Sequence, residues 1–406
     1  MKLFYFTLSY PYGIGEQWKT NELQVLRHAF ENITVVPYGY AGNFDNPKPL
    51  PEGVDCLDPL FRTSDYTVSK KDVLRILFSR HLPVFAGEFL TKRVFLRKDW
   101  LLSWFVSTVK ALDMLSHPVL KRIVSSMDEE TVFYFYWGKG LCDIMPFIRK
   151  GRLRKSVVRM HRFDLFEYVN NGYLPYRRRL LESISTAISV SQAGKDHMDG
   201  LYPDLAQKIV VMRCGTRDNG RRSPSSTDGK TRIVSCSYLI PVKRVELMIE
   251  TLALLGSHVE WHHIGDGPLR PELERAASER GVSDRFIFHG LLDSERVLDF
   301  YSSNPFDCFV NMSQSEGVPI SIMEALSAGI PVLATAVGGT SEIVDESVGR
   351  SLRPDVTPME LSETIRQIEA MSPEETRVMR DGCFERYRDR CDAEKLAREL
   401  TEFLVS

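Results

Sequence analysis

Two glutamates eight residues apart, Glu316 and Glu324, have the types and spacing that best suit ligand chemistry in this chain. An ionised carboxylate only accepts hydrogen bonds, which suits the paired hydroxyls of a sugar or a ribose. Gly317 and Val318 follow the first glutamate, and a glycine there lets the backbone approach a phosphate closely. These four residues are therefore candidates for contact with a ligand that carries hydroxyls.

The surrounding pattern predicts a strand, a loop, a helix and a second strand. Residues 307–312 (DCFVNM) have the character of a buried strand, and Pro319 suits the start of a helix over 320–328. The next buried strand is expected over 331–335, and a further helix after Gly338–Thr340. Such a unit points unpaired N–H groups at the strand ends, where phosphates are favoured. A nucleotide sugar carries both hydroxyls and phosphate.

A lysine in a second predicted loop could neutralise that phosphate. Residues 231–235 predict a strand, the loop after it contains Tyr238, Lys243 and Arg244, and an apolar-periodic helix follows over 245–255. A cation beside a helix start suits the charge that grows on a leaving diphosphate. The polar, Gly- and Ser-rich residues 215–230 before this strand predict an interdomain linker.

Length and composition bound the class of protein. A chain of 406 residues exceeds what one core usually supports, so two domains are expected. A net charge of −2 argues against bulk nucleic-acid binding. Seven scattered cysteines without a Cys-x-x-Cys pair are typical of reduced, cytosolic thiols. No stretch approaches the roughly 18 apolar residues of a spanning helix, and the N-terminus predicts a strand rather than a signal peptide.

The N-terminal part offers a second place for an anion. Lys2–Ser9 predicts a strand, and a loop with Gly13, Gly15 and Glu16 follows before an expected helix over 17–29. Backbone N–H groups of such a loop can face an anion. A tight turn also needs glycine for its geometry alone, so both interpretations remain open.

A histidine and an aspartate follow a later predicted strand, 156–160, which itself contains Arg159. His161 and Asp164 come directly after this strand. Open α/β sheets place ligand groups just beyond the carboxyl ends of their strands. A lone histidine is often structural, but these three residues are candidates for ligand contact.

Between these motifs lies a stretch with little chemical signal. Residues 47–59 are a proline-rich connection, and about 60–125 predicts a helical insertion with aromatic, aliphatic and basic residues. One interpretation is a set of helices that pack on the first domain. The other is a basic, aromatic face that rests on a membrane.

The pattern Glu-Gly-x-Pro-x-x-x-x-Glu-Ala, followed by Gly-x-Pro-Val and Gly-Gly, resembles the signature of glycosyltransferase family 4. The resemblance implies the GT-B architecture, an α/β fold of two Rossmann-like domains facing across a cleft. We expect a first domain over 1–214, a nucleotide-sugar domain over 231–385, and a final helix over 386–406 that crosses back to the first domain.

The resemblance also implies roles for the candidate residues. Glu316, Lys243 and His161 form the expected catalytic set, with Glu316 on the donor sugar's hydroxyls and His161 on the sugar or acceptor. Glu324 would accept hydrogen bonds from the ribose diol. The family carries an arginine five residues before the lysine, and here that position is Tyr238. Either Arg244 supplies the second cation or Tyr238 donates a hydrogen bond.

The remaining expected contacts complete the site. Gly13, Gly15, Gly265 and Gly267 are expected to line the donor, with Leu291 near the nucleobase. The acceptor side is expected to use the polar residues of the first domain, Arg159, Asp164 and Glu16.

The implied function is retaining transfer of a hexosyl group from a nucleotide diphosphate sugar to a hydroxyl of a glycan or lipid-linked acceptor, in polysaccharide or glycolipid biosynthesis. No cofactor or metal is expected, because cations of the chain would serve the diphosphate and no Asp-x-Asp motif occurs. The protein is expected in the cytoplasm, with peripheral contact at the inner face of the membrane left open. Alternatives are a non-catalytic nucleotide-sugar binder, or an epimerase or hydrolase on the same fold.

Overall fold

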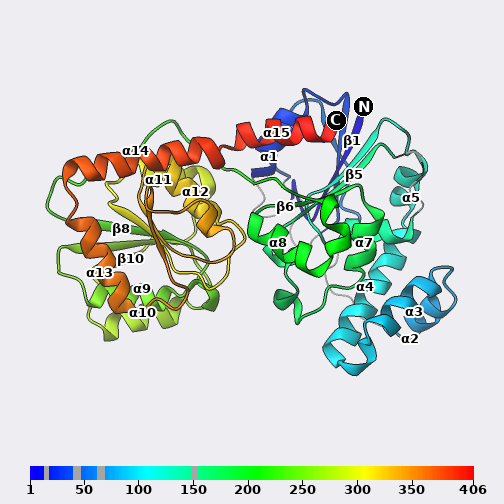
Figure 1. The fold of residues 1–406 in the computed structure, drawn as a ribbon, viewed down its shortest axis with the longest axis horizontal. Coiled ribbons are helices and arrows are strands. Elements are labelled where there is room, and N and C mark those ends of the chain that lie inside the picture. The colour runs from blue at the N-terminus through cyan, green and yellow to red at the C-terminus, as the bar shows by residue number, and fades with distance from the viewer. Residues whose placement is uncertain (13–17, 40–46, 62–68, 149–150, 152) are drawn as a thin grey trace. The chain divides into compact units, whose positions relative to one another are not determined.

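The computed structural model of the chain describes residues 1–12, 18–39, 47–61, 69–148, 151 and 153–406. Internal contacts divide it into two compact units (Figure 1). Unit 1 comprises residues 1–212 and 397–406, and unit 2 comprises residues 213–396. Each unit is built around one parallel sheet, as expected for an α/β chain of this length.

The seven-stranded sheet of unit 1 is parallel throughout. Its spatial order is β3 (Val54–Cys56), β2 (Asn32–Pro37), β1 (Lys2–Thr7), β4 (Thr131–Phe135), β5 (Lys155–Met160), β6 (Thr186–Ser189) and β7 (Ile209–Val211). Every residue of β4 is buried, as a strand covered on both faces requires. The direction in which the strands are added reverses between β1 and β4.

Helices cover both faces of this sheet. They are α1 (Trp18–Leu26), α6 (Arg162–Leu165), α7 (Arg177–Ser183) and α8 (Gln192–Leu201), with 3₁₀ turns η2 (Leu141–Phe147), η3 (Glu167–Asn170) and η4 (Pro203–Lys208). α1 packs in one apolar cluster through Leu23 and Leu26, and α8 packs in another through Met198. The carboxyl ends of the strands are left to the loops that carry the predicted polar residues.

A helical insertion lies between β3 and β4. It contains α2 (Lys70–Leu77), α3 (Leu82–Thr91), η1 (Val94–Leu96), α4 (Lys98–Ser116) and α5 (Pro118–Ser125). It has its own apolar cluster, in which Phe85, Val94 and Trp104 meet Phe147 and Tyr176 from the body of the unit. Among the described residues, none of the helices has both the length and the apolar character that a bilayer crossing requires.

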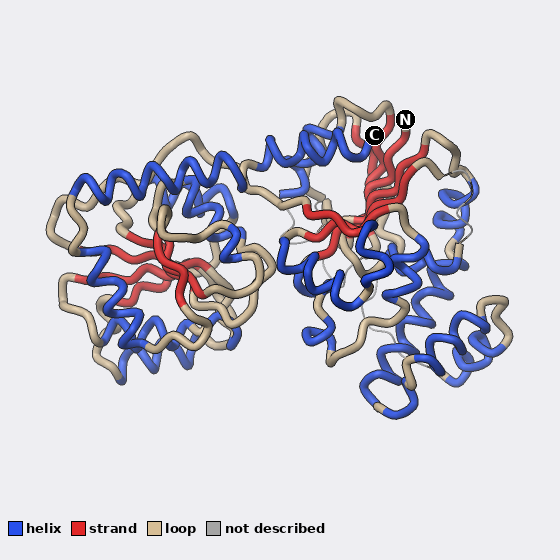
Figure 2. Tube along the Cα trace, in the orientation of Figure 1, coloured by secondary structure: helices blue, strands red, loops and turns tan. Residues whose placement is uncertain are grey.

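The six-stranded sheet of unit 2 is also parallel (Figure 2). Its spatial order is β10 (Phe286–Phe288), β9 (Val259–Ile264), β8 (Thr231–Cys236), β11 (Cys308–Asn311), β12 (Val332–Thr335) and β13 (Gly349–Leu352). The strand order reverses between β8 and β11.

The helices of unit 2 are α9 (Val245–Ala253), α10 (Arg270–Glu279), α11 (Ser294–Ser303), α12 (Ile320–Ser327), α13 (Pro358–Glu369) and α14 (Pro373–Arg390). A 3₁₀ turn, η5 (Pro241–Lys243), precedes α9, and another, η6 (Thr340–Glu342), follows β12. The helix predicted after Gly338–Thr340 is therefore wrong. η6 ends after one turn and the chain continues into β13, an edge strand too short to show a pattern.

The segment expected as a linker packs on unit 2. The Ser223 N–H donates to the carbonyl of Ala328 at 2.9 Å, and its hydroxyl donates to the carbonyl of Asn304 at 2.8 Å. Thr216 forms an isolated β-bridge with Asp392. Backbone groups of this polar stretch thus find partners along the surface of the unit, which is why it does not behave as a free connection.

The last helix, α15 (Ala393–Val405), begins in unit 2 and ends in unit 1. Leu400 and Leu404 are fully buried in the cluster that contains Leu3, Tyr5 and Leu23. Arg154 and Lys155 donate to the carbonyls of Val405 and Phe403, at 2.7 and 2.5 Å. These contacts complete one apolar face of the unit 1 sheet.

Candidate functional site

The candidate site of unit 2 lies where the strand order of its sheet reverses. Ligands of parallel α/β sheets bind beyond the carboxyl ends of the strands at such a point. The loop after β8 carries Lys243 and the loop after β11 carries Glu316. Lys243 Nζ lies 2.5 Å from Glu316 Oε1. The two side chains are 20% and 11% exposed, so this charged pair is largely buried but still reaches the surface.

Two further bonds hold these loops together. The N–H of Gln314 donates to the carbonyl of Val242 at 2.8 Å. Arg244 Nε donates to the carbonyl of Met312 at 2.6 Å, from a residue with a left-handed backbone φ of 51°. Arg244 therefore positions the loop after β11. Its guanidinium is committed to the protein through Nε.

The loop of Glu316 is shaped by close backbone contact with the turn after β12. The N–H of Gly339 donates to the carbonyl of Gly317 at 2.6 Å. Gly338 has a φ of +54°, and a Cβ there would lie 2.0 Å from the carbonyl oxygen of Glu316. Only glycine fits this approach. Gly317 and Val318 are half-buried in the same loop.

Glu324 lies one turn into α12, which begins after Pro319 at its N-cap. Its side chain is buried, and Oε1 accepts a 2.6 Å hydrogen bond from the hydroxyl of Ser294 at the start of α11. Burial raises the pKa of Glu324 to about 7, and the hydrogen bond from Ser294 opposes this shift. The carboxyl group is thus poised to change its charge near neutral pH.

Two large side chains of the predicted donor set remain exposed. Tyr238, after β8, is 59% exposed, and Leu291, after β10, is 54% exposed. The two predicted glycines near them have a geometric role. A Cβ at Gly265 would lie 1.9 Å from the carbonyl oxygen of Ser237, and one at Gly267 would lie 2.7 Å from that of Leu239. These glycines allow the loop after β9 to pack on the loop after β8.

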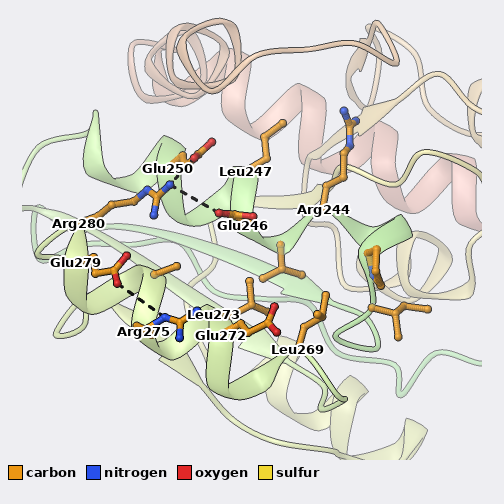
Figure 3. Close-up of a pocket in the computed structure, with 14 residues that line it drawn as sticks. Arg244, Glu246, Leu247, Glu250, Leu269, Glu272, Leu273, Arg275, Glu279 and Arg280 are labelled. Carbon is orange, nitrogen blue, oxygen red and sulfur yellow. Dashed lines mark hydrogen bonds and ion pairs between the residues drawn. The ribbon is translucent and has the colours of Figure 1, made fainter.

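A pocket of about 620 Å³ lies between α9 and α10 (Figure 3). Neither glutamate of the candidate site lines it, and Arg244 stands at one end. Its charged lining is largely self-paired, since Arg280 meets Glu250 at 2.5 Å and Glu246 at 3.8 Å. The candidate site therefore lies at the point where the strand order of unit 2 reverses, and not in this pocket.

In unit 1, Asp164 joins the ends of two strands. Its Oδ2 accepts the N–H of Gly138, after β4, and its Oδ1 accepts the N–H of His161, after β5. Asp164 is only 1% exposed, and burial raises its pKa to about 6. Both oxygens of its carboxylate therefore accept hydrogen bonds from backbone N–H groups. The structure thus makes Asp164 a positioning residue for His161, rather than a group that faces an acceptor.

The ring of His161 stacks on Tyr136 at a centroid distance of 5.1 Å and lies 4.4 Å from the ring of Trp137. Burial, with the nearby cations Arg159 and Lys19, holds the pKa of His161 well below its usual value. The imidazole is therefore neutral at pH 7, which suits it to exchange hydrogen bonds.

Arg159 points into the core of unit 1. It is 2% exposed, its Nη1 pairs with Glu22 Oε2 of α1 at 2.6 Å, and it lies over the rings of Tyr134 and Tyr136. Arg159 therefore belongs to the interior of unit 1 and is not exposed for the predicted acceptor contact. The predicted Gly13, Gly15 and Glu16 lie outside the described residues.

Sequence reasoning missed Ser294 and Glu22. Ser294 follows Asp293, whose side chain caps α11 by accepting the N–H of Arg296 at 2.9 Å. That cap is a readable signal for the helix start, but nothing local links Ser294 to Glu324.

As to metals, the described ranges contain no group of three or more His, Cys, Asp or Glu placed to hold an ion.

Residues 216–382 match the family model of the group 1 glycosyl transferases. A curated relative is the 2-deoxystreptamine glucosyltransferase of Streptomyces kanamyceticus, 31% identical over 30% of each chain. The alignments span 30%, 45% and 18% of the length of the first three curated relatives.

Solved structures resemble the whole chain. The lipopolysaccharide outer core galactosyltransferase WaaB is 14% identical, with a TM-score of 0.69 and 99% of each chain covered. Anabaena HepE in complex with UDP and glucose is 17% identical, with a TM-score of 0.66 and 100% of each chain covered. These matches confirm the predicted GT-B fold with its two Rossmann-like sheets.

Proposed function

We propose that this chain is a group 1 glycosyltransferase, of family 4, that transfers a hexosyl group with retention from a nucleotide diphosphate sugar to a hydroxyl acceptor. The observation that carries the proposal is the Lys243–Glu316 pair at the reversal point of unit 2, inside the segment that matches the group 1 model. A similar curated protein is named a glucosyltransferase, and a similar structure holds UDP and glucose. Both names support a nucleotide-sugar donor.

The diphosphate of the donor would take Glu316's place beside Lys243. The ammonium group then meets the negative charge that grows on the diphosphate as the glycosidic bond breaks. Unpaired N–H groups at the start of α12 add to this stabilisation. Glu316, released from Lys243, becomes an acceptor for hydroxyls of the donor sugar.

Glu324 would hold the ribose. Its Oε1 accepts from Ser294, and no described residue donates to Oε2. A ribose diol presents two donors, and their bonds are stronger to an ionised carboxylate than to a protonated one. Donor binding would therefore draw Glu324 into its charged form.

The second group on the diphosphate is, in this proposal, Tyr238. Its side chain is largely exposed, whereas Arg244 is tied to the carbonyl of Met312. In Figure 3 the guanidinium of Arg244 points away from the pocket between α9 and α10. Arg244 would support the donor site by holding the loop before Glu316.

The transfer step is balanced without a protein base. The acceptor oxygen forms a bond to the anomeric carbon on the face that the diphosphate leaves, and the bond to the diphosphate oxygen breaks. The acceptor's proton passes to the departing phosphate. Lys243 and the α12 N–H groups supply the positive charge, so the proposal requires no metal or cofactor.

Unit 1 would supply the acceptor side through His161, which Asp164 holds in place. The proposed acceptor is a glycan or a lipid-linked glycan in polysaccharide or glycolipid biosynthesis. The similarity to a galactosyltransferase of the lipopolysaccharide outer core supports that class. We place the protein in the cytoplasm, in peripheral contact with the inner face of the membrane.

A thermal-shift panel tests the donor site. Wild type, Glu324→Ala and the control Glu246→Ala, an exposed acid on α9, are melted with UDP, GDP and their sugars. One nucleotide family should stabilise wild type and the control, by about 2.7 kcal/mol at one hundred times Kd. Glu324→Ala should lose this shift. No shift with any nucleotide in wild type would overturn the donor-site assignment.

Turnover separates the proposal from its alternatives. The stabilising sugar nucleotide is incubated with and without glycan acceptors, and products are followed by NMR, which reads the anomeric configuration. Acceptor-dependent transfer with retention supports the proposal. Donor consumption without acceptor would identify a hydrolase or epimerase, and binding without turnover a non-catalytic binder.

A further inference from the structure

A histidine is buried in the sheet of unit 2. His263 of β9 is fully buried, and its ring lies 6.4 Å from the ring of Phe286 and 6.0 Å from that of Phe288. Burial lowers the pKa of His263 to about 4, so the imidazole is neutral at pH 7. A buried polar group costs free energy unless it is hydrogen-bonded, so the partners of His263 indicate what it does.

Both ring nitrogens have partners, and these partners fix the direction of each hydrogen bond. Nε2 lies 3.2 Å from the carbonyl oxygen of Ser237, and Nδ1 lies 2.8 Å from the hydroxyl of Ser235. A carbonyl only accepts, so in the neutral ring Nε2 carries the proton and Nδ1 accepts. Ser235 then donates to Nδ1, and its oxygen accepts the indole N–H of Trp261 at 2.9 Å. We call Trp261, Ser235, His263 and the carbonyl of Ser237 the His263 network.

The His263 network is built into two paired strands. Ser235 of β8 lies opposite His263 in the register of the sheet, and Trp261 is on the same face of β9 because it is two residues away. A network in which every member has a partner makes the core around it rigid. The backbone adds a second restraint, since a Cβ at Gly265 would lie 1.9 Å from the carbonyl oxygen of Ser237. The core of unit 2 therefore sets the direction of that carbonyl.

This carbonyl determines where the next N–H points. The Ser237–Tyr238 peptide is trans, so the N–H of Tyr238 points opposite to the carbonyl of Ser237. Ser237 directs both backbone groups toward β9, because its N–H donates to the carbonyl of Ile264 at 2.9 Å and its carbonyl accepts from His263. Since β8 lies between β9 and β11, the N–H of Tyr238 faces the β11 side, where the strand order reverses. No described residue accepts a hydrogen bond from it.

We propose that this N–H donates to the diphosphate of the nucleotide sugar, and that His263 is the positioning residue that directs it there. The inference rests on the proposed donor site and adds a backbone contact to it. Phosphate oxygens are charged acceptors, which form the stronger hydrogen bonds with N–H groups. Without the His263 network the peptide between Ser237 and Tyr238 is free to rotate, and its N–H turns away from the ligand.

Nuclear magnetic resonance of the full chain, labelled with ¹⁵N-tyrosine, tests the contact. The signal of Tyr238 is assigned by its absence from the spectrum of Tyr238→Phe. UDP and GDP are compared at saturation with uridine and guanosine, which lack the phosphates. The nucleotide that binds should move the amide proton of Tyr238 downfield, and its nucleoside should not. Equal responses to both, or no response to a nucleotide that binds, would overturn the proposal.

Three variants separate positioning from stability. His263→Leu removes both ring nitrogens, and His263→Gln keeps an N–H donor on its ε atom. The matched control is His262→Leu, which removes a largely buried imidazole from the opposite face of β9, where Nδ1 lies 2.9 Å from Nε2 of His289.

His263→Leu should lose the downfield shift and bind the nucleotide roughly tenfold more weakly or worse, the effect of losing one hydrogen bond to a charged group. His263→Gln should recover most of the shift, and His262→Leu should keep all of it. Melting temperatures and circular dichroism without ligand show whether each variant is folded. If His263→Leu does not fold, Ser235→Ala replaces it, because removing the donor to Nδ1 frees the ring to change its tautomer and should reduce the shift.

A folded His263→Leu or Ser235→Ala that matches His262→Leu in both shift and affinity would refute the positioning role. The outcomes also separate this inference from the proposed function. Nucleotide binding without a response of Tyr238 would refute the inference alone, and a response without sugar transfer would refute the proposed function alone. If no nucleotide binds, both are refuted.

Discussion

The ammonium of Lys243 lies 2.5 Å from the carboxylate of Glu316, and the two charges neutralise each other across the point where the strand order of unit 2 reverses. Each side chain comes from a different loop, one after β8 and one after β11. Removing either would leave the other charge partly buried and without its partner.

Lys243→Met should lower the rate of transfer by about 100- to 1,000-fold, the usual effect of losing one group that stabilises charge in the transition state. Lys230→Met is the control, since Lys230 is 49% exposed and pairs with Glu260 at the other end of β8. Initial rates with the donor identified by thermal shift provide the measurement. A Lys243→Met enzyme within tenfold of wild type would remove Lys243 from the chemistry.

Glu324 should make the stability of the protein depend on pH. Its pKa is raised from 4.5 to about 7 by burial, so between these values the native state holds a proton that the unfolded chain has lost. The free energy of unfolding therefore falls as pH rises through this window, by about 3 kcal/mol in total. Glu324→Gln does not titrate. Urea denaturation at about pH 5 and about pH 8 should show the variant gaining on wild type at the higher pH. If the unfolding free energies of wild type and Glu324→Gln differed by the same amount at both pH values, the raised pKa would be contradicted.

Removing the hydroxyl of Ser294 should shift the pH dependence of donor binding. The Ser294 hydrogen bond stabilises the charged form of Glu324 at 2.6 Å, so Ser294→Ala raises the pKa of that carboxyl further. Donor affinity, which we expect to rise as Glu324 ionises, should then rise at a higher pH than in wild type. Calorimetric titrations across neutral pH measure the midpoint. Ser294→Thr keeps a hydroxyl and should have the wild-type midpoint. An unchanged midpoint in Ser294→Ala would show that the hydrogen bond does not act on Glu324.

Asp164→Ala should destabilise unit 1, because two buried N–H groups, of Gly138 and His161, lose their acceptor. Leaving such groups unpaired costs about 1–3 kcal/mol each. Asp196→Ala, at an exposed position of α8, should change the unfolding free energy by less than about 0.5 kcal/mol. Denaturation curves of both variants make the comparison, and equal stabilities would rule out the bridging role.

Gly338→Ala should weaken donor binding more than it weakens the fold. A Cβ there meets the carbonyl of Glu316 at 2.0 Å, so the loop that presents Glu316 must move. Gly229→Ala is the matched control, since Gly229 also has a positive φ, +76°, but has open space around it. The control should cost about 1 kcal/mol of stability and leave donor affinity unchanged. Nucleotide titration of the two variants decides, and equal affinities would contradict the contact.

The elements that position the donor site could be predicted because their signals are local. The expected strand over 307–312, helix over 320–328 and strand over 331–335 agree with β11, α12 and β12 to within two residues at each end. A buried apolar run and a proline at a helix start are patterns of neighbouring residues, so the sequence alone shows them. Short edge strands such as β3 and β13 were missed because three or four residues carry too little pattern.

The partners of the buried polar groups could not be predicted. Arg159 was expected at a ligand, but Glu22, its partner, is 137 residues earlier in the chain. In a strand buried on both faces, a charged residue and its apolar neighbours follow no alternation that would show which way it points. The link between Ser294 and Glu324 likewise depends on the packing of α11 beside α12.

The burial of Leu400 and Leu404 in unit 1 has a consequence for how the protein is made. All seven strands of that sheet leave the ribosome before unit 2 does, yet the apolar cluster that α1 shares with α15 lacks Leu400 and Leu404 until α15 emerges. The core of unit 1 therefore remains incomplete while unit 2 is synthesised. Apolar surface that is exposed during such an interval makes a chain prone to aggregation, which is the hazard that chaperones counter.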